Sequence, residues 1–245
     1  MHADPRLAQA LEAARYAVLR RIGPALRHDL LVNLQSLLMK TEVVTARLDR
    51  GLPPLADLQH HLGRIERDAR EAIANSLCAA AWLAPPEDDR IDLRAGIEQC
   101  LKLVRAELEF RGSTVQAHLP PACFEVSSAC LRPLVIAALI HLADQASARG
   151  QLRVDAQLDR DCACLTFEWL ADPSDSDSDS HSACVTQDAP LNDRRLAPHE
   201  VQVLAAAGGA DLYLEHHFIA IGLHERDELP DRTKKNGLTL LELTR

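Results

Sequence analysis

The chain has few aromatic residues and no long apolar stretch. Only two tryptophans, two tyrosines and four phenylalanines occur in 245 residues, although 47% of the residues are hydrophobic. The core must therefore consist mainly of leucine, valine, isoleucine and alanine, which suits helix packing better than a β-sandwich. No stretch reaches the roughly 20 apolar residues that span a membrane, and the first four residues do not open a signal peptide. We expect a cytoplasmic protein with no membrane partner.

The chain also has fewer basic than acidic residues. The 27 lysines and arginines are outnumbered by 36 acidic residues, which gives a net charge of −9. A nucleic-acid partner is not expected, because binding phosphates needs a basic face. The cysteines are scattered, and Cys162 and Cys164 have no second close pair with which to complete a zinc site, so we predict free thiols and no bound metal.

Helical spacing dominates the first third of the chain. Apolar residues recur at intervals of three and four over residues 7–48 and again over 55–83. Gly51 ends the first stretch and the prolines at 53–54 precede the second, so an antiparallel helical hairpin is predicted. We expect a kink or a fresh helix start at Pro24. A lone hairpin leaves its apolar stripe half exposed, so we predict a homodimer whose helices form a four-helix bundle.

Two prolines followed by charged residues mark a linker at 84–90, which separates predicted domains at 1–84 and 91–245. The Ser/Asp run at 172–181 buries nothing and is expected to be a disordered loop. Helices on one face of a mixed sheet make the second domain an α/β sandwich, and the whole chain an α+β protein. Its expected helices cover 91–110, 131–148 and 197–207, and its expected strands cover 115–119, 123–126, 152–158, 162–170, 211–215, 218–223 and 237–243.

One histidine stands out within the first helix. At about 100° per residue, His28 lies well away from the seam that includes Leu26 and Leu30, so it should face solvent or a partner. An exposed imidazole followed at once by the carboxylate of Asp29 has the features that a phosphoryl-carrying histidine needs. The alternative is an ordinary exposed histidine, because a His-Asp neighbour pair can arise by chance among 11 histidines.

The run from Arg27 to Asp29, followed by Leu34 and Gln35, resembles the histidine box of sporulation phosphotransferases and their kinase relatives. With the layout of hairpin, linker and sandwich, the chain resembles the sensor histidine kinase core. Residues 1–84 are similar to its dimerisation and histidine-phosphotransfer domain, and residues 91–245 to its GHKL-type ATP-binding domain. The roles that this resemblance implies are catalysis by His28 and Asp29, and contact with the partner by Arg27, Leu31 and Gln35.

The nucleotide motifs of this family are largely replaced. His141 and Gln145 stand where its magnesium-holding asparagines would be, and glutamine is one methylene too long. Trp169 stands near the position of the adenine-binding aspartate, with no glycine after it. Residues 196–200 and the Ser/Asp run replace the glycine-rich lid that would wrap the phosphates. We expect no productive ATP binding and no cofactor held by this chain, so magnesium would come with the partner.

The resemblance therefore implies a histidine phosphotransferase in a bacterial two-component phosphorelay, acting on response-regulator receiver domains. Val32 stands four residues after His28, where relatives that also dephosphorylate their partner often carry asparagine or threonine, so phosphatase activity is not expected. Two alternatives stay open. One is a divergent ATP-dependent sensor histidine kinase, and the other is a non-catalytic pseudokinase scaffold.

Overall fold

The computed structural model describes residues 5–51, 54–83, 89–110, 112–121, 123–146, 149–172 and 195–224. The chain divides into two compact units. The helical unit is Ile22–Pro85, and the α/β unit combines Met1–Arg21 with Pro86–Arg245. Residues up to Arg21 thus group with the α/β unit, whereas the sequence-based domains place them with the hairpin. The predicted domain boundaries stay a prediction.

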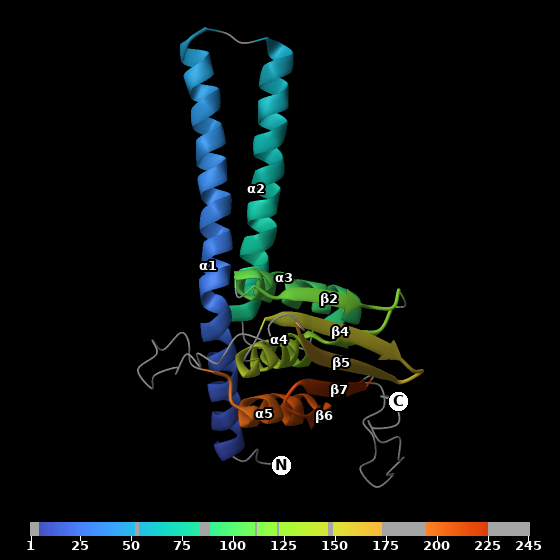
Figure 1. Cartoon of the computed structure of the whole chain (residues 1–245). Coiled ribbons are helices and arrows are strands. Elements are labelled where there is room, and N and C mark those ends of the chain that lie inside the picture. The colour runs from blue at the N-terminus through green and yellow to red at the C-terminus, as the bar shows by residue number, and fades with distance from the viewer. Residues whose placement is uncertain are drawn as a thin grey trace, which may run out of the picture. The chain divides into compact units, whose positions relative to one another are not determined.

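Two long helices form the predicted hairpin: α1 is Pro5–Asp49 and α2 is Leu55–Leu83 (Figure 1). Helix α1 runs without interruption through Pro24, so the expected fresh start there is wrong. One proline removes a single backbone hydrogen bond, and this loss is small against the remaining bonds of a 45-residue helix. No described helix is both long and apolar enough to cross a membrane.

Polar contacts join α1 and α2 within the hairpin. The Asp68 carboxylate accepts hydrogen bonds from Lys40 and, at 3.0 Å, from Ser36. The hydrogen bond from Lys40, more than that from Ser36, holds the pKa of Asp68 below its usual value. The hairpin still exposes apolar side chains at 43–66% of their area, namely Leu31, Leu34, Leu38 and Leu48 on α1 and Leu62, Ile73 and Leu77 on α2.

The α/β unit contains a five-stranded mixed sheet in the order β2-β4-β5-β7-β6, in which only β2 and β4 are parallel. A separate antiparallel pair joins β1 and β3. The elements are β1 Arg90–Asp92, α3 Leu93–Phe110, β2 Thr114–His118, β3 Glu125–Ser127, α4 Ser128–Gln145, β4 Gly150–Leu158, β5 Cys162–Ala171, α5 Pro198–Gly208, β6 Asp211–Leu214 and β7 Phe218–His224. This arrangement confirms the predicted fold class of a helical hairpin followed by an α/β sandwich.

Helix α4 lies at the centre of the α/β core. It packs against α3 and α5 on either side and against β5 and β7 of the sheet. Leu139 on α4, Phe167 on β5 and Ile219 on β7 are fully buried. Asp92 caps the start of α3, since its Oδ1 atom accepts a hydrogen bond from the Ala95 amide at 3.0 Å.

Several predicted boundaries need correction. Helix α4 begins three residues before the predicted start at 131. The pairing of β1 with β3 was missed, because strands of three residues are too short to show alternation. The predicted strand at 237–243 and the Ser/Asp run beyond Asp172 lie outside the described residues.

Candidate functional site

The His28 side chain lies on α1 with 74% of its area exposed, as the helical spacing predicted. Its Nδ1 atom is 3.6 Å from Oδ1 of Asp29, whose side chain is 41% exposed. This distance is within ion-pair range and is longer than a hydrogen bond. The carboxylate therefore faces one ring nitrogen and leaves the other, Nε2, to solvent.

Such an arrangement suits a nucleophilic imidazole. In a neutral histidine one ring nitrogen carries the proton and the other carries a lone pair. When the proton is on Nδ1, beside the carboxylate, the lone pair lies on Nε2 and is available for attack. The exposed face around His28 would admit a large reactant such as another protein.

The next three turns of α1 continue the same side of the helix. Leu31 and Val32 are 51% and 46% exposed and follow His28 by three and four residues. Gln35 is also exposed, one turn further on, and Met39 follows at 65%. We call these five residues the His28 face. Val32 and Met39 were missed as surface candidates, although their spacing of four and eleven residues from His28 signals one helix side.

Arg27 is exposed as well, but it lies about 100° around the helix from His28. Leu31 and Gln35 therefore share a face with His28, and Arg27 borders that face. The described structure thus brings together most of the residues that the sequence singled out, on one helix and within two turns.

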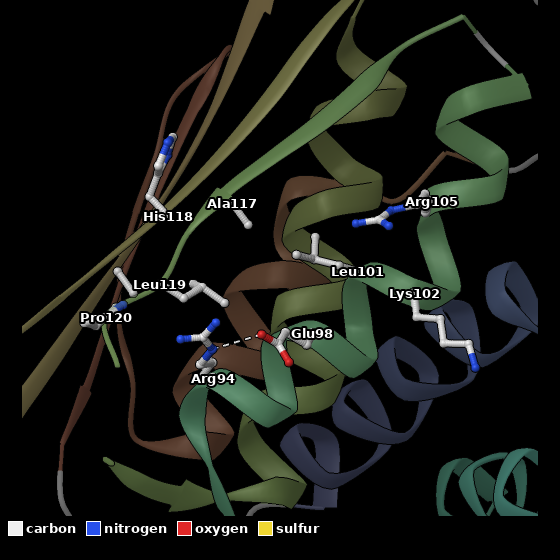
Figure 2. A pocket seen from close by; sticks show the side chains of 10 residues that line it. Arg94, Glu98, Leu101, Lys102, Arg105, Ala117, His118, Leu119 and Pro120 are labelled. Atoms are coloured by element: carbon white, nitrogen blue, oxygen red, sulfur yellow. Dashed lines mark hydrogen bonds and ion pairs between the residues drawn. The ribbon is translucent and has the colours of Figure 1, made fainter. Parts of the chain in front are cut away.

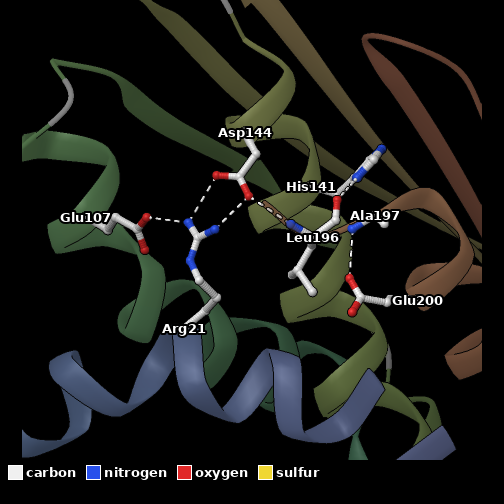
Figure 3. Close-up of polar contacts among 7 residues, drawn as sticks. All are labelled: Arg21, Glu107, His141, Asp144, Leu196, Ala197 and Glu200. Atoms are coloured by element: carbon white, nitrogen blue, oxygen red, sulfur yellow. Dashed lines mark hydrogen bonds and ion pairs between the residues drawn. The ribbon is translucent and has the colours of Figure 1, made fainter. Parts of the chain in front are cut away.

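The second region to which the sequence pointed is on α4, and there the polar residues are buried. His141 is 1% exposed and Asp144 is 7% exposed. His141 Nδ1 lies 2.8 Å from the carbonyl oxygen of Leu196 and donates to it, and the Leu196 amide donates to Asp144 Oδ2 at 3.2 Å (Figure 3). The two side chains therefore bind both the carbonyl and the amide of Leu196, which lies two residues before the start of α5.

A buried arginine from α1 completes this cluster. Arg21 donates two hydrogen bonds to the Asp144 carboxylate, at 2.6 and 3.0 Å, and a third to Glu107 on α3 at 2.8 Å (Figure 3). Burial opposes the charge of Arg21, but the bonds and charges of Asp144 and Glu107 outweigh it and raise the pKa of the guanidinium above its usual value. Neither Arg21 nor its partners were predicted to interact.

The third region, near the expected adenine-binding position on β5, is filled by an indole ring. Trp169 is 6% exposed. A Cβ atom added to Gly150 would lie 2.8 Å from the indole Nε1 and would collide with the carbonyl oxygen of Leu170. Only glycine fits this point of β4. No group of three or more possible metal ligands gathers anywhere in the part of the chain that the structure describes.

No protein-family model matches the sequence, and no curated protein matches it. Solved structures do match. The histidine kinase AdeS of Acinetobacter baumannii covers 81% of this chain and 98% of its own, at 14% identity and a TM-score of 0.42. A bacterial phosphotransferase covers 91% of this chain and 98% of its own, at 15% identity and a TM-score of 0.37. A histidine kinase from Burkholderia phymatum covers 90% of this chain and 97% of its own, at 14% identity and a TM-score of 0.37.

The chain is similar to histidine kinases. The solved structures that match thus include proteins of the kinds that the sequence resembles, at 14–15% identity.

Proposed function

We propose that the chain is a histidine phosphotransferase of a two-component phosphorelay, with His28 as the phosphoryl acceptor. The observation that carries the proposal is the exposed imidazole of His28 with the carboxylate of Asp29 beside Nδ1. Nothing on the His28 face is buried, so the acidic pocket of a receiver domain could approach it. A cytoplasmic location with such receivers belongs to the same proposal.

The proposed reaction is a double displacement. His28 Nε2 attacks the phosphorus of an aspartyl-phosphate, the bond from phosphorus to the carboxylate oxygen breaks, and that carboxylate leaves. Asp29 stabilises the positive charge that develops on the ring. In the second step a carboxylate oxygen of another receiver attacks the phosphohistidine, the N–P bond breaks, and the imidazole leaves. Magnesium held by the receiver would supply neutralisation of the phosphoryl charge.

The His28 face would also form the docking surface. Leu31, Val32 and Met39 offer apolar contact area, and Gln35 and Arg27 offer hydrogen bonds to a partner. The exposed apolar side chains of α1 and α2 further support a homodimer, in which a second hairpin would cover them and close a four-helix bundle.

The cluster on α4 supports the absence of productive ATP binding. His141 and Asp144 already bind the backbone of Leu196, and Arg21 already neutralises Asp144. A nucleotide with its magnesium would have to displace these contacts. We infer that the α/β unit is a degenerate ATP-binding-like domain whose remaining role is to help dock the receiver.

The proposal is tested by radiolabel transfer from a phosphorylated receiver to three proteins: the wild type, His28→Ala, and the matched control His60→Ala on α2. Acid-labile label is expected on the wild type and on His60→Ala, and none on His28→Ala. Label that persists on His28→Ala would overturn the assignment. Label acquired from ATP alone would identify a kinase, and intact receiver binding without label would identify a scaffold.

A further inference from the structure

A pocket of about 970 Å³ lies between α3 and the edge strand β2, entirely within the α/β unit (Figure 2). It shares no lining residue with the cluster on α4. The side chains of its apolar floor come from three elements and the turn after β2. Leu101 on α3, one of these side chains, is 3% exposed. The floor consists of Leu101, Ala117, Leu119, Pro120 and Ala156, and we call the pocket the α3–β2 groove.

One stripe of α3 provides the charged wall of the groove. Arg94, Glu98, Leu101 and Arg105 follow one another at intervals of four, three and four residues, so they share a helix face. Arg94 is paired with Glu98 at 2.9 Å. Arg105 is exposed and has no hydrogen-bond or ion-pair partner among the residues that the structure describes. Lys102 also borders the groove. Two arginines thus share one acid on this face of α3, in a chain whose net charge is −9.

The dimensions of this wall fit an extended peptide. Arg94 and Arg105 are eleven residues apart, which is about 16 Å along a helix axis, the length of about five residues of extended chain. In Figure 2 both guanidinium groups lie on the side of α3 that faces β2, with Leu101 between them. Two separated cations with an apolar floor between them are too far apart to hold a single phosphate group.

The opposite wall is a sheet edge. Strand β2 pairs with β4 on one side, and no described strand pairs with its other side. Its five residues contain no proline, so its outer N–H and C=O groups can pair with an added strand. A groove between a helix and an open strand edge is a geometry by which proteins bind extended peptides.

We propose that the α3–β2 groove binds an extended acidic segment of a partner protein. One carboxylate of the segment pairs with Arg105, whose planar fork suits a bidentate contact, and a second replaces Glu98 on Arg94. An apolar side chain between them packs on Leu101 and Ala117, and the backbone pairs with β2. This surface is independent of phosphotransfer at His28.

The probe is a fluorescent peptide of about ten residues with two glutamates four positions apart and a leucine midway between them, because residues an even number of positions apart share one face of an extended chain. Its anisotropy is measured against the full-length protein. Binding is expected to weaken roughly tenfold or more when glutamine replaces both glutamates, or in Arg105→Glu, because each loses a charge-assisted pair. Arg160→Glu, the same charge change in the exposed turn between β4 and β5, and His28→Ala should bind as the wild type does.

A second variant tests the floor. Ala117→Gln places a longer side chain in the groove from an exposed position on β2, and it should also weaken binding while the thermal midpoint stays that of the wild type. The proposal is overturned by absence of peptide binding at millimolar concentration, or by equal binding of the glutamate and glutamine peptides. It is also overturned if inorganic phosphate or ATP alone binds in an Arg105-dependent way, or if Arg105→Glu changes the oligomeric mass without peptide.

Discussion

His28 on α1 and His141 on α4 are the same residue type in opposite environments. His28 is 74% exposed and has one carboxylate near one ring nitrogen, whereas His141 is 1% exposed and donates from Nδ1 to a backbone carbonyl. An exposed ring costs no packing when its bonding changes, so it can gain and lose a phosphoryl group. A buried ring that satisfies a backbone group cannot change without leaving that group unpaired. Exposure and partners, more than sequence context, distinguish a candidate carrier from a structural histidine.

The largest effect is expected where the buried cluster loses its charge balance. Arg21→Ala leaves Asp144 buried without its guanidinium partner, and this should lower the free energy of unfolding by about 3–5 kcal/mol. Urea denaturation followed by circular dichroism measures the change. The double variant Arg21→Met with Asp144→Leu should lose less than either single change. If Arg21→Ala unfolds at the wild-type urea concentration, the cluster does not stabilise the α/β unit.

Substitution of His141 and of His28 should also have different effects on the free energy of unfolding. His141→Ala leaves the Leu196 carbonyl without its donor, which should cost about 1–3 kcal/mol. His28→Ala removes an exposed side chain and should stay within about 0.5 kcal/mol of the wild type. Thermal and urea unfolding of both variants, beside transfer assays, should show stability lost in one and transfer lost in the other. Equal losses of stability would remove the distinction.

A pair of glycines extends the comparison to the backbone. Gly150→Ala drives a methyl group into the Leu170 carbonyl and the Trp169 indole, and should destabilise by about 1–3 kcal/mol. Gly63→Ala on α2 meets nothing within 4 Å and should stabilise the helix by up to about 1 kcal/mol. Differential scanning calorimetry should show opposite shifts of the unfolding midpoint. Shifts of the same sign would contradict the packing around Trp169.

The smallest effect is expected at the acid beside His28. Asp29→Asn removes the charge but keeps the shape, and an exposed ion pair is worth about 1 kcal/mol or less. Receiver-to-protein transfer should therefore slow by no more than about fivefold. Rapid-quench measurement of the phosphohistidine provides the rate, with Asp57→Asn on α2 as the control. A complete loss of transfer would assign Asp29 a direct chemical role.

Local patterns were enough to predict the hairpin, most of the sheet strands and the exposure of His28. Apolar residues at intervals of three and four predicted both long helices, because this signal lies within the helix that it specifies. At Pro24 the sequence allowed a kink or a fresh helix start; α1 continues through this position, so the fresh start is wrong, and the kink stays a prediction.

The cluster around Asp144 could not be predicted from the sequence, because its members are far apart along the chain. Arg21 and Asp144 are separated by 123 positions, and His141 and Leu196 by 55. The sequence showed that the residues on α4 differ from the nucleotide-holding pattern. Only the fold shows that they bind other parts of the same protein instead.

The pairing of Arg21 with Asp144 also restricts how this protein can evolve. Loss of Arg21 alone leaves the Asp144 carboxylate buried without its guanidinium, at a cost of about 3–5 kcal/mol against a typical total stability of about 5–15 kcal/mol. Loss of Asp144 alone leaves the buried Arg21 with Glu107 but without its two-bonded partner. Lineages that pass through such a single-step intermediate would lose much of their folded population. The two positions should therefore be inherited as a unit, changing together or not at all, and among related sequences a loss of one would mark the loss of the other.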